Sequence, residues 1–263
     1  MRNALRSGGT AVLLSLTVIS PAFADWTIGG FLGSAHTRAA SLALTQPADS
    51  TDVSLSPVRY RSDSMTAPLY YGYRVGCFPR SGWLGIEGEF IHLKVAADTT
   101  RDTHITGTLR GDPVNGFVRL SDVVERFSIS HGVNLLLVNA VARRQAGVDR
   151  TGDARWTVTA RLGAGASIPH PESTIAGRYV EGYEWGSLSV QAAAGLEMRL
   201  TRRLSLLGEY KLTRSIQNVT VSGGTAVTPL TTHHFVAGMT VRFRAAHPAP
   251  ESERLKGAGS RTR

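Results

Sequence analysis

Histidine is the residue type in this sequence whose placement could support chemistry. A neutral imidazole binds transition metals, and it exchanges protons near neutral pH. No nucleophile elbow, P-loop, Cys-x-x-Cys or His-Glu-x-x-His motif accompanies the histidines. Six of them fall at or near the same end of segments with alternating polarity: His36, His92, His131, His170, His233 and His234. The sequence therefore offers imidazole chemistry at one level of a fold, without specifying a reaction or a metal.

The segments that would position these histidines alternate strictly in polarity. In 187–200, apolar side chains occupy one parity from Leu188 to Leu200, and small or polar ones the other. Such alternation indicates a β-strand. It is least clean in 128–144, where Asn134 and Asn139 fall on opposite faces unless a β-bulge separates them. Seven more segments share the pattern: 26–36, 66–78, 83–95, 128–144, 155–168, 204–215 and 231–243.

The connections between these strands alternate in length. Four are long and polar, namely 38–65, 96–127, 169–183 and 216–230, and three are short, namely 79–82, 145–154 and 201–203. This alternation predicts an all-β fold, an eight-stranded antiparallel up-and-down transmembrane β-barrel with its apolar face toward lipid. Five aromatic residues near the short turns are expected to form the inner aromatic girdle: Trp26, Phe78, Trp83, Trp156 and Phe243.

The other parity carries charge. Five basic and four acidic residues fall on it, and they nearly balance: Arg74, Glu87, Glu89, Arg161, Glu197, Arg199, Glu209, Lys211 and Arg242. We expect them to form a network of ion pairs that plugs the lumen, since eight strands leave no room for a pore. The alternative is a soluble barrel of the lipocalin kind with its apolar face inside, which these charges disfavour.

The composition and the N-terminal sequence indicate the cellular compartment. Residues 1–24 have the basic start, apolar stretch and Ala22-Phe23-Ala24 cleavage site of a signal peptide, residues 25–243 would form the barrel, and 244–263 a flexible basic tail. Of the net charge of +9, the signal peptide holds two and the tail three, which leaves four for the barrel. That is too few for a nucleic-acid binder. We expect a monomer in the outer membrane of a Gram-negative bacterium.

Strand order decides which histidines could cooperate. His92, His131 and His170 belong to adjacent strands, whereas a site uniting His36 with His170 would require the loops to fold over the barrel. Ordinary polar contacts at the membrane interface are the alternative for all of them. By parity His92, Lys94 and Arg214 face outward, where cations bind lipid phosphates or simply extend toward water.

The chain resembles a known family, the outer-membrane lipid A oxidases, which are similar to OmpA-type eight-stranded barrels. The likeness covers most of residues 26–243. It is carried by I-G-G-F (28–31) with His36, A-P-L-Y-Y-G-Y-R (67–74), E-F-I-H-L-K-V (89–95), G-V-N-L-L-L-V-N (132–139), W-T-V-T-A-R-L-G-A-G-A-S-I-P-H (156–170), V-Q-A-A-A-G (190–195) and E-Y-K (209–211). Arg161 and the tail after Phe243 depart from the family pattern.

The resemblance implies an oxidoreductase that uses molecular oxygen to convert the proximal glucosamine of lipid A to 2-aminogluconate, with lipid A as its partner. His36, His92 and His170 are the candidate catalytic residues, and Lys94, His131 and Arg214 the candidate substrate-binding residues. The alternative is a non-enzymatic OmpA-like protein that stiffens the envelope or presents its loops for adhesion.

Overall fold

The computed structural model describes residues 24–79, 82–148 and 154–243. The predicted signal peptide, apart from Ala24, and the predicted tail lie outside these ranges. No helix within the described ranges is long and apolar enough to cross a membrane.

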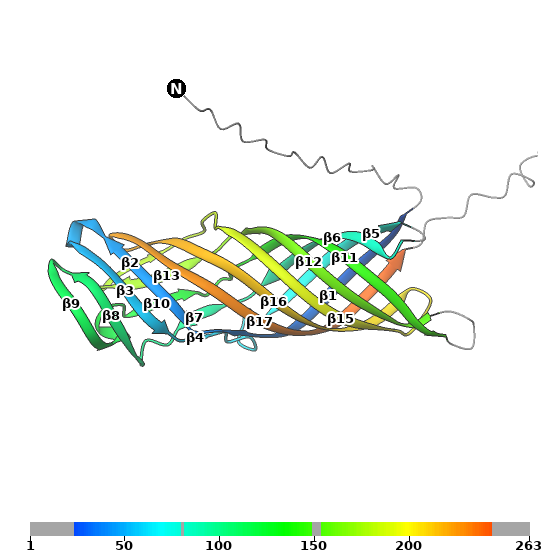
Figure 1. Ribbon diagram of the computed structural model, residues 1–263, viewed down its shortest axis with the longest axis horizontal. Coiled ribbons are helices and arrows are strands. Elements are labelled where there is room, and N and C mark those ends of the chain that lie inside the picture. Colours follow the sequence, from blue (N-terminus) through cyan, green and yellow to red (C-terminus); the bar gives the residue numbers. More distant parts are fainter. Residues whose placement is uncertain (1–23, 80–81, 149–153, 244–263) are drawn as a thin grey trace, which may run out of the picture.

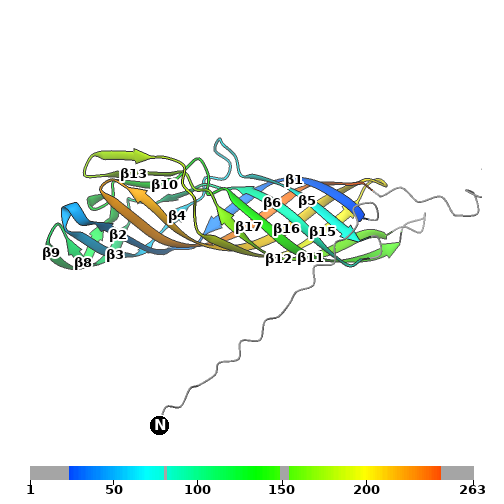
Figure 2. The ribbon, with the colours of Figure 1, turned by 90° about the horizontal axis from the view of Figure 1, so that it is seen from above.

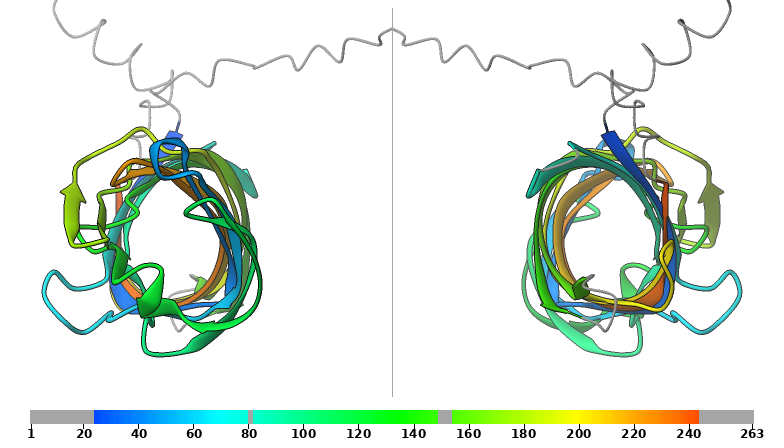
Figure 3. Two further views of the ribbon diagram at one scale, coloured as in Figure 1. Left: turned by 90° about the vertical axis from the view of Figure 1, so that its left-hand side faces the viewer. Right: turned by 90° about the vertical axis from the view of Figure 1, so that its right-hand side faces the viewer.

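Eight long strands form a closed antiparallel ring. They are β1 (Ala24–Thr37), β5 (Tyr71–Pro79), β6 (Leu84–His92), β11 (Leu135–Val148), β12 (Ala154–Ser167), β15 (Leu188–Arg199), β16 (Leu204–Val221) and β17 (Gly224–Phe243). Each pairs with the next in this order, and β1 pairs with β17 from Trp26↔Phe243 to Thr37↔Thr232. The views along the long axis show the ring (Figure 3). The predicted barrel is therefore confirmed.

The apolar parity of these strands points outward. Leu162 and Leu188 are 69% and 70% exposed, and Ile28 and Val158 on other strands are also exposed. A soluble barrel would bury these side chains in its interior, so the lipocalin alternative is wrong. A wall of exposed aliphatic side chains around a polar interior is the exterior of a membrane-spanning barrel. The chain is thus an outer-membrane β-barrel.

The inner girdle differs from the prediction at one residue. Trp26, Trp83 and Phe243 are exposed as expected, but Phe78 is 4% exposed and points into the barrel. Its ring lies 4.0 Å from the guanidinium carbon of Arg143. Phe78 shares the parity of Gly76 and Arg74, so strand alternation itself places it inside.

The long connections are not loops, which corrects the prediction for all four. The hairpin formed by β16 and β17 extends through 216–230, and four strands continue the sheet from β17, in the order β2 (Ala40–Gln46), β3 (Thr51–Val58), β8 (Asp102–Leu109) and β9 (Asp112–Arg119). A second sheet consists of β14 (Arg178–Glu181), β13 (Pro171–Ile175), β10 (Arg126–Ile129), β7 (Val95–Ala97) and β4 (Tyr60–Arg61). Two short 3₁₀ turns, η2 (Pro47–Asp49) and η3 (Leu120–Asp122), complete this part.

These strands form an outer half that prolongs the barrel at the end away from the short turns (Figures 1 and 2). Its interior is apolar. Buried side chains from both sheets pack into one core that includes Leu42, Leu44, Val53, Leu55, Ile105, Phe127, Ile129, Val219 and Val221. The loop prediction failed because each strand here is short, so its alternation is lost among the polar residues of the turns.

Strand β16 passes through both halves, and the polarity of each of its faces changes along its length. Its buried face runs from Glu209 and Lys211 through Thr213, Ser215 and Gln217 to Val219 and Val221. Its exposed face changes in the opposite sense, from Tyr210 and Leu212 to Arg214, Asn218 and Thr220, with Ile216 as an apolar side chain among these polar ones. The exterior becomes mainly polar after Leu212, which marks the outer limit of the membrane-spanning part on this strand.

The predicted fourth strand, 128–144, is two strands rather than one strand with a bulge. Ser128 and Ile129 belong to β10 of the second sheet, and β11 of the barrel begins at Leu135. The turn between them is tight, with Gly132 at φ 104° and Asn134 at φ 47°. A side chain at Gly132 would collide with the ring of His92. This turn explains the parity conflict of Asn134 and Asn139, and it places the residues described next.

Candidate functional site

Four of the histidines form two separate pairs. His36 and His233 are ladder partners on β1 and β17, and the hydroxyl of Tyr210 lies 2.7 Å from Nδ1 of His233. His131 and His170 lie elsewhere, beside the ends of β11 and β12. At least three strands separate β1 from β12 in either direction around the ring. The structure therefore does not unite His36 with His92 and His170 as one catalytic set.

His131 and His170 meet at Glu172. Nδ1 of His131 lies 3.0 Å from Oε1 of Glu172, and Nδ1 of His170 lies 4.0 Å from the same oxygen. The two imidazole rings are 4.7 Å apart and nearly perpendicular. One nitrogen or oxygen atom from each residue falls within 4.8 Å of those of the other two. We call these three residues the rim cluster.

The backbone holds the rim cluster from two sides. The amide of His170 donates to the carbonyl of Gly132, and the amide of Ile168 donates to that of Asn134, which fixes the 130–134 turn against the end of β12. Glu172 lies on β13 opposite Ser128 of β10. Its carboxylate is nearly buried and also contacts Arg126 and the hydroxyl of Ser130.

Glu172 was not among the residues selected from the sequence. It lies two positions after His170, and in an extended strand that spacing puts both side chains on one face. The spacing in His170-Pro171-Glu172 therefore indicated that the two side chains lie together. Because 169–183 was expected to be a loop, and a two-residue spacing does not fix side-chain direction in a loop, Glu172 was missed.

His92 does not face lipid, which corrects the prediction from parity. Its side chain is buried, with Nδ1 2.9 Å from Oδ1 of Asn134 and its ring stacked at 5.0 Å on Tyr71. The turn through Gly132 covers it. His92 supports the turn that carries His131, and it is not placed to meet a membrane lipid directly.

The two predicted lipid-binding cations lie apart. Nζ of Lys94 donates to the carbonyls of Thr66 and Ala67, at 2.8 and 3.3 Å. Lys94 lines a cavity of about 370 Å³ together with Arg61, Asp63, Glu125, Arg126 and Ser130, so this cavity adjoins the rim cluster through Ser130 and Arg126. Arg214 is exposed on β16, opposite Thr231 and Val190, on another side of the barrel.

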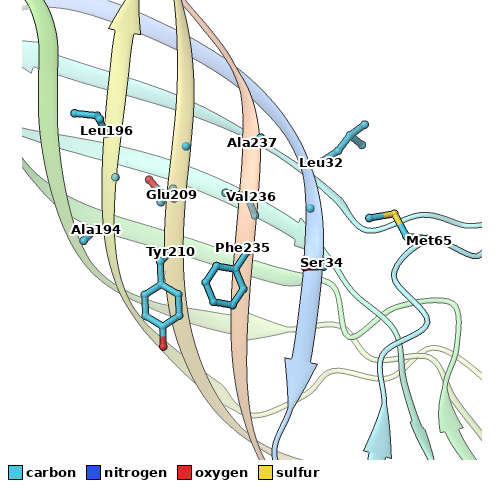
Figure 4. Close-up of a pocket in the computed structure, with 13 residues that line it drawn as sticks. Leu32, Ser34, Met65, Ala194, Leu196, Glu209, Tyr210, Phe235, Val236 and Ala237 are labelled. Atoms are coloured by element: carbon cyan, nitrogen blue, oxygen red, sulfur yellow. The ribbon is translucent and has the colours of Figure 1, made fainter.

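An apolar groove of about 930 Å³ runs along the outer wall over β1, β15, β16 and β17. Figure 4 shows Tyr210 and Phe235 side by side in it, with Leu32 and Leu196 projecting from neighbouring strands. Small residues, among them Ala194, Gly208 and Ala237, form its floor. Tyr210 lines this groove, and its hydroxyl forms a hydrogen bond with Nδ1 of His233. The shape and polarity suit a hydrocarbon chain.

The lumen is filled by a connected charge network. Seven of the nine predicted residues are buried, and Glu209 contacts three cations: Arg74 at 3.1 Å, Lys211 at 2.7 Å, and Arg161. Glu87 pairs with Arg161 at 2.9 Å, and Glu89 pairs with Lys211. Arg199 and Arg242 are half-buried, toward the inner end. Two neutral residues that charge patterning missed, Asn139 and Gln191, donate to Glu89.

This network leaves little room for a reactant. Lys211 and Glu87 are completely enclosed, and the apolar core of the outer half lies beyond them along the axis. The lumen is therefore structural, and chemistry on an external molecule must take place at the outer surface.

The chain matches no protein-family model and no curated protein. Among solved structures it is similar to OprG, an outer-membrane protein of Pseudomonas aeruginosa, with 8% identity over 84% of this chain and 96% of that one and a TM-score of 0.44. It is also similar to the outer-membrane protease OmpT of Escherichia coli (9%, 87% and 100%, 0.43) and to the attachment invasion locus protein Ail of Yersinia pestis (11%, 84% and 97%, 0.35). At such identities and TM-scores, none of these likenesses tells what this chain does.

Proposed function

We propose that this protein is an outer-membrane enzyme that modifies lipid A, oxidising the proximal glucosamine to 2-aminogluconate with molecular oxygen. The observation that carries the proposal is the rim cluster, which lies just beyond the last lipid-facing residues of β11 and β12, where a glycolipid head group would be. The resemblance of the sequence to lipid A oxidases supplies the reaction.

The reaction balances with molecular oxygen and water as the other reactants. The hemiacetal carbon C1 of the glucosamine loses its hydrogen as a proton together with two electrons, and its hydroxyl loses a second proton, which gives the lactone. Molecular oxygen takes up the two electrons and two protons and becomes hydrogen peroxide. Water then opens the lactone to the aldonic acid. The imidazole of His131 is the most exposed group of the rim cluster and the one that an approaching sugar would meet first.

The surroundings of the rim cluster suit an anionic sugar. Arg61, Lys94 and Arg126 outnumber Asp63 and Glu125 around the adjoining cavity, which favours a saccharide that carries a phosphate at a position other than C1. Tyr183 packs against His170 at 4.4 Å and gives the sugar an aromatic surface.

The test is mass spectrometry of lipid A from cells that express the protein under air. A gain of one oxygen atom in mass is expected, because the hemiacetal becomes a carboxylic acid. His170→Ala should abolish the gain, and His36→Ala, which alters a rim histidine outside the cluster, should preserve it. Unchanged lipid A mass with correctly inserted wild-type protein contradicts the proposal.

A non-enzymatic role is the second candidate, and the outer half favours it. Nine short strands form two sheets on a continuous core, which is a large structured surface for contact with another cell or molecule. This role predicts that substitutions in the rim cluster leave lipid A unchanged while changes on the outer sheets alter adhesion.

A further inference from the structure

We infer that the rim cluster binds one divalent transition-metal ion through His131, His170 and Glu172. Two imidazoles and one carboxylate are a common ligand set for such ions, and three protein ligands leave coordination positions open for small molecules. Binding of the ion does not depend on the proposed oxidation, so the two proposals can fail separately.

The distances fit a metal site that closes slightly on binding. Ligand atoms bonded to one ion at about 2.1 Å lie about 3 to 3.4 Å apart. Nδ1 of His131 and Oε1 of Glu172 are already 3.0 Å apart, and Nδ1 of His170 needs to approach that oxygen from 4.0 Å. A small rotation of one imidazole brings this pair into range.

A second observation points to a ligand at this site. Nδ1 of His170 is buried and has no hydrogen-bond partner within the described residues. A buried polar atom without a partner costs about 1–3 kcal/mol, so its presence calls for an explanation. The atom faces Glu172, and an ion bound there would be its partner.

The residues around the cluster also suit a metal site. Arg126 contacts Oε2 of Glu172, which leaves Oε1 for the ion and orients the carboxylate. The hydroxyl of Ser130 contacts Oε1 as well, and it provides a second point of support. Because Arg126 offsets part of the carboxylate charge, the two histidines are essential for a transition metal to bind.

The experiment uses full-chain protein in detergent, without a histidine tag, after removal of metal with EDTA. Titration with Co²⁺ followed by visible absorption should show one ion per chain. His170→Ala and Glu172→Gln should each abolish the saturable signal. Ser130→Ala removes a supporting contact and no ligand, and it should weaken binding about 10-fold. Metal analysis of protein isolated directly from membranes identifies the natural ion.

The matched control is the double variant His36→Ala/His233→Ala, which removes two neighbouring rim histidines that lack a carboxylate. It should bind Co²⁺ as the wild type does. Each variant is compared with the wild type in its unboiled gel mobility, which reports a closed barrel. If folded wild-type protein binds no Co²⁺, or if Glu172→Gln and the wild type bind it equally, the inference is wrong.

Discussion

Glu209 is the residue on which the lumen network converges. Its carboxylate contacts Arg74, Arg161 and Lys211, and all four side chains are buried. Glu209→Gln keeps the shape and removes the charge, so three cations lose their common partner. The expected loss in the free energy of unfolding is about 3–5 kcal/mol, the range for breaking a buried ion pair. Urea unfolding in lipid vesicles, followed by tryptophan fluorescence, measures it.

The control for this prediction is Asp102→Asn. Asp102 pairs with Arg119 at 3.9 Å, and both side chains are more than half exposed. Such a pair contributes at most about 1 kcal/mol. Equal losses in the two variants would show that burial of the network adds nothing to its strength.

At the residue scale, parity was sufficient where a strand is long and regular. It placed Arg74, Glu89 and Lys211 on the inner face because a strand gives each side chain only two directions. Parity does not show which neutral side chains of the inner face join the charge network, so Asn139 and Gln191 were missed. It did not reveal Glu172, because its two-residue spacing from His170 has a meaning only in a strand, and 169–183 was expected to be a loop.

At the element scale, β16 sets the outer limit of the membrane at about Leu212. Substitution to arginine tests this assignment, because its cost depends on depth in the bilayer. Leu162→Arg, on the exposed face of β12, should cost about 2–4 kcal/mol of unfolding free energy, and Asn218→Arg, on the outer half, should cost almost nothing. The same unfolding experiment compares them. A comparable cost at both positions would contradict the limit.

Tyr60 ties the two sheets of the outer half together. Its hydroxyl lies 2.7 Å from that of Thr228, and burial raises the pKa of Tyr60 to about 12. An unfolded tyrosine titrates near 10, so the neutral phenol stabilises the fold below about pH 10, and this contribution is lost as pH rises toward 12. Tyr60→Phe should therefore flatten the stability profile between these values, measured by circular dichroism during urea unfolding.

The same variant has a cost at neutral pH. Phenylalanine leaves the buried hydroxyl of Thr228 without its partner, which should lower stability by about 1 kcal/mol. A variant whose alkaline profile still parallels that of the wild type would show that Tyr60 does not control it.

The eight barrel strands could be predicted because each has a full membrane-spanning alternation. The nine short strands outside the membrane could not. Strand β4 has two residues and β7 has three, too few for any periodicity. Residue types such as those of Leu42 and Ile105 also occur in loops. These side chains form a core only because segments that are distant in the sequence pair with one another.

At the scale of the whole molecule, the barrel is much taller than the apolar band of the outer membrane. The 18 residues of β16, at about 3.3 Å each and tilted by about 40°, rise roughly 45 Å, against an apolar band of about 25 Å. The outer half is therefore a structured projection of roughly 20 Å, and the rim cluster lies at its base, near the membrane surface.

The charged plug and the apolar core follow each other along a single axis, so the barrel is sealed twice. An electrical consequence follows, because neither seal admits a hydrated ion. A planar lipid bilayer containing the wild-type protein should keep its baseline current under an applied voltage. Glu209→Gln should remain equally silent, because weakening the lower seal leaves the upper one intact. We therefore expect the protein not to conduct ions across the membrane.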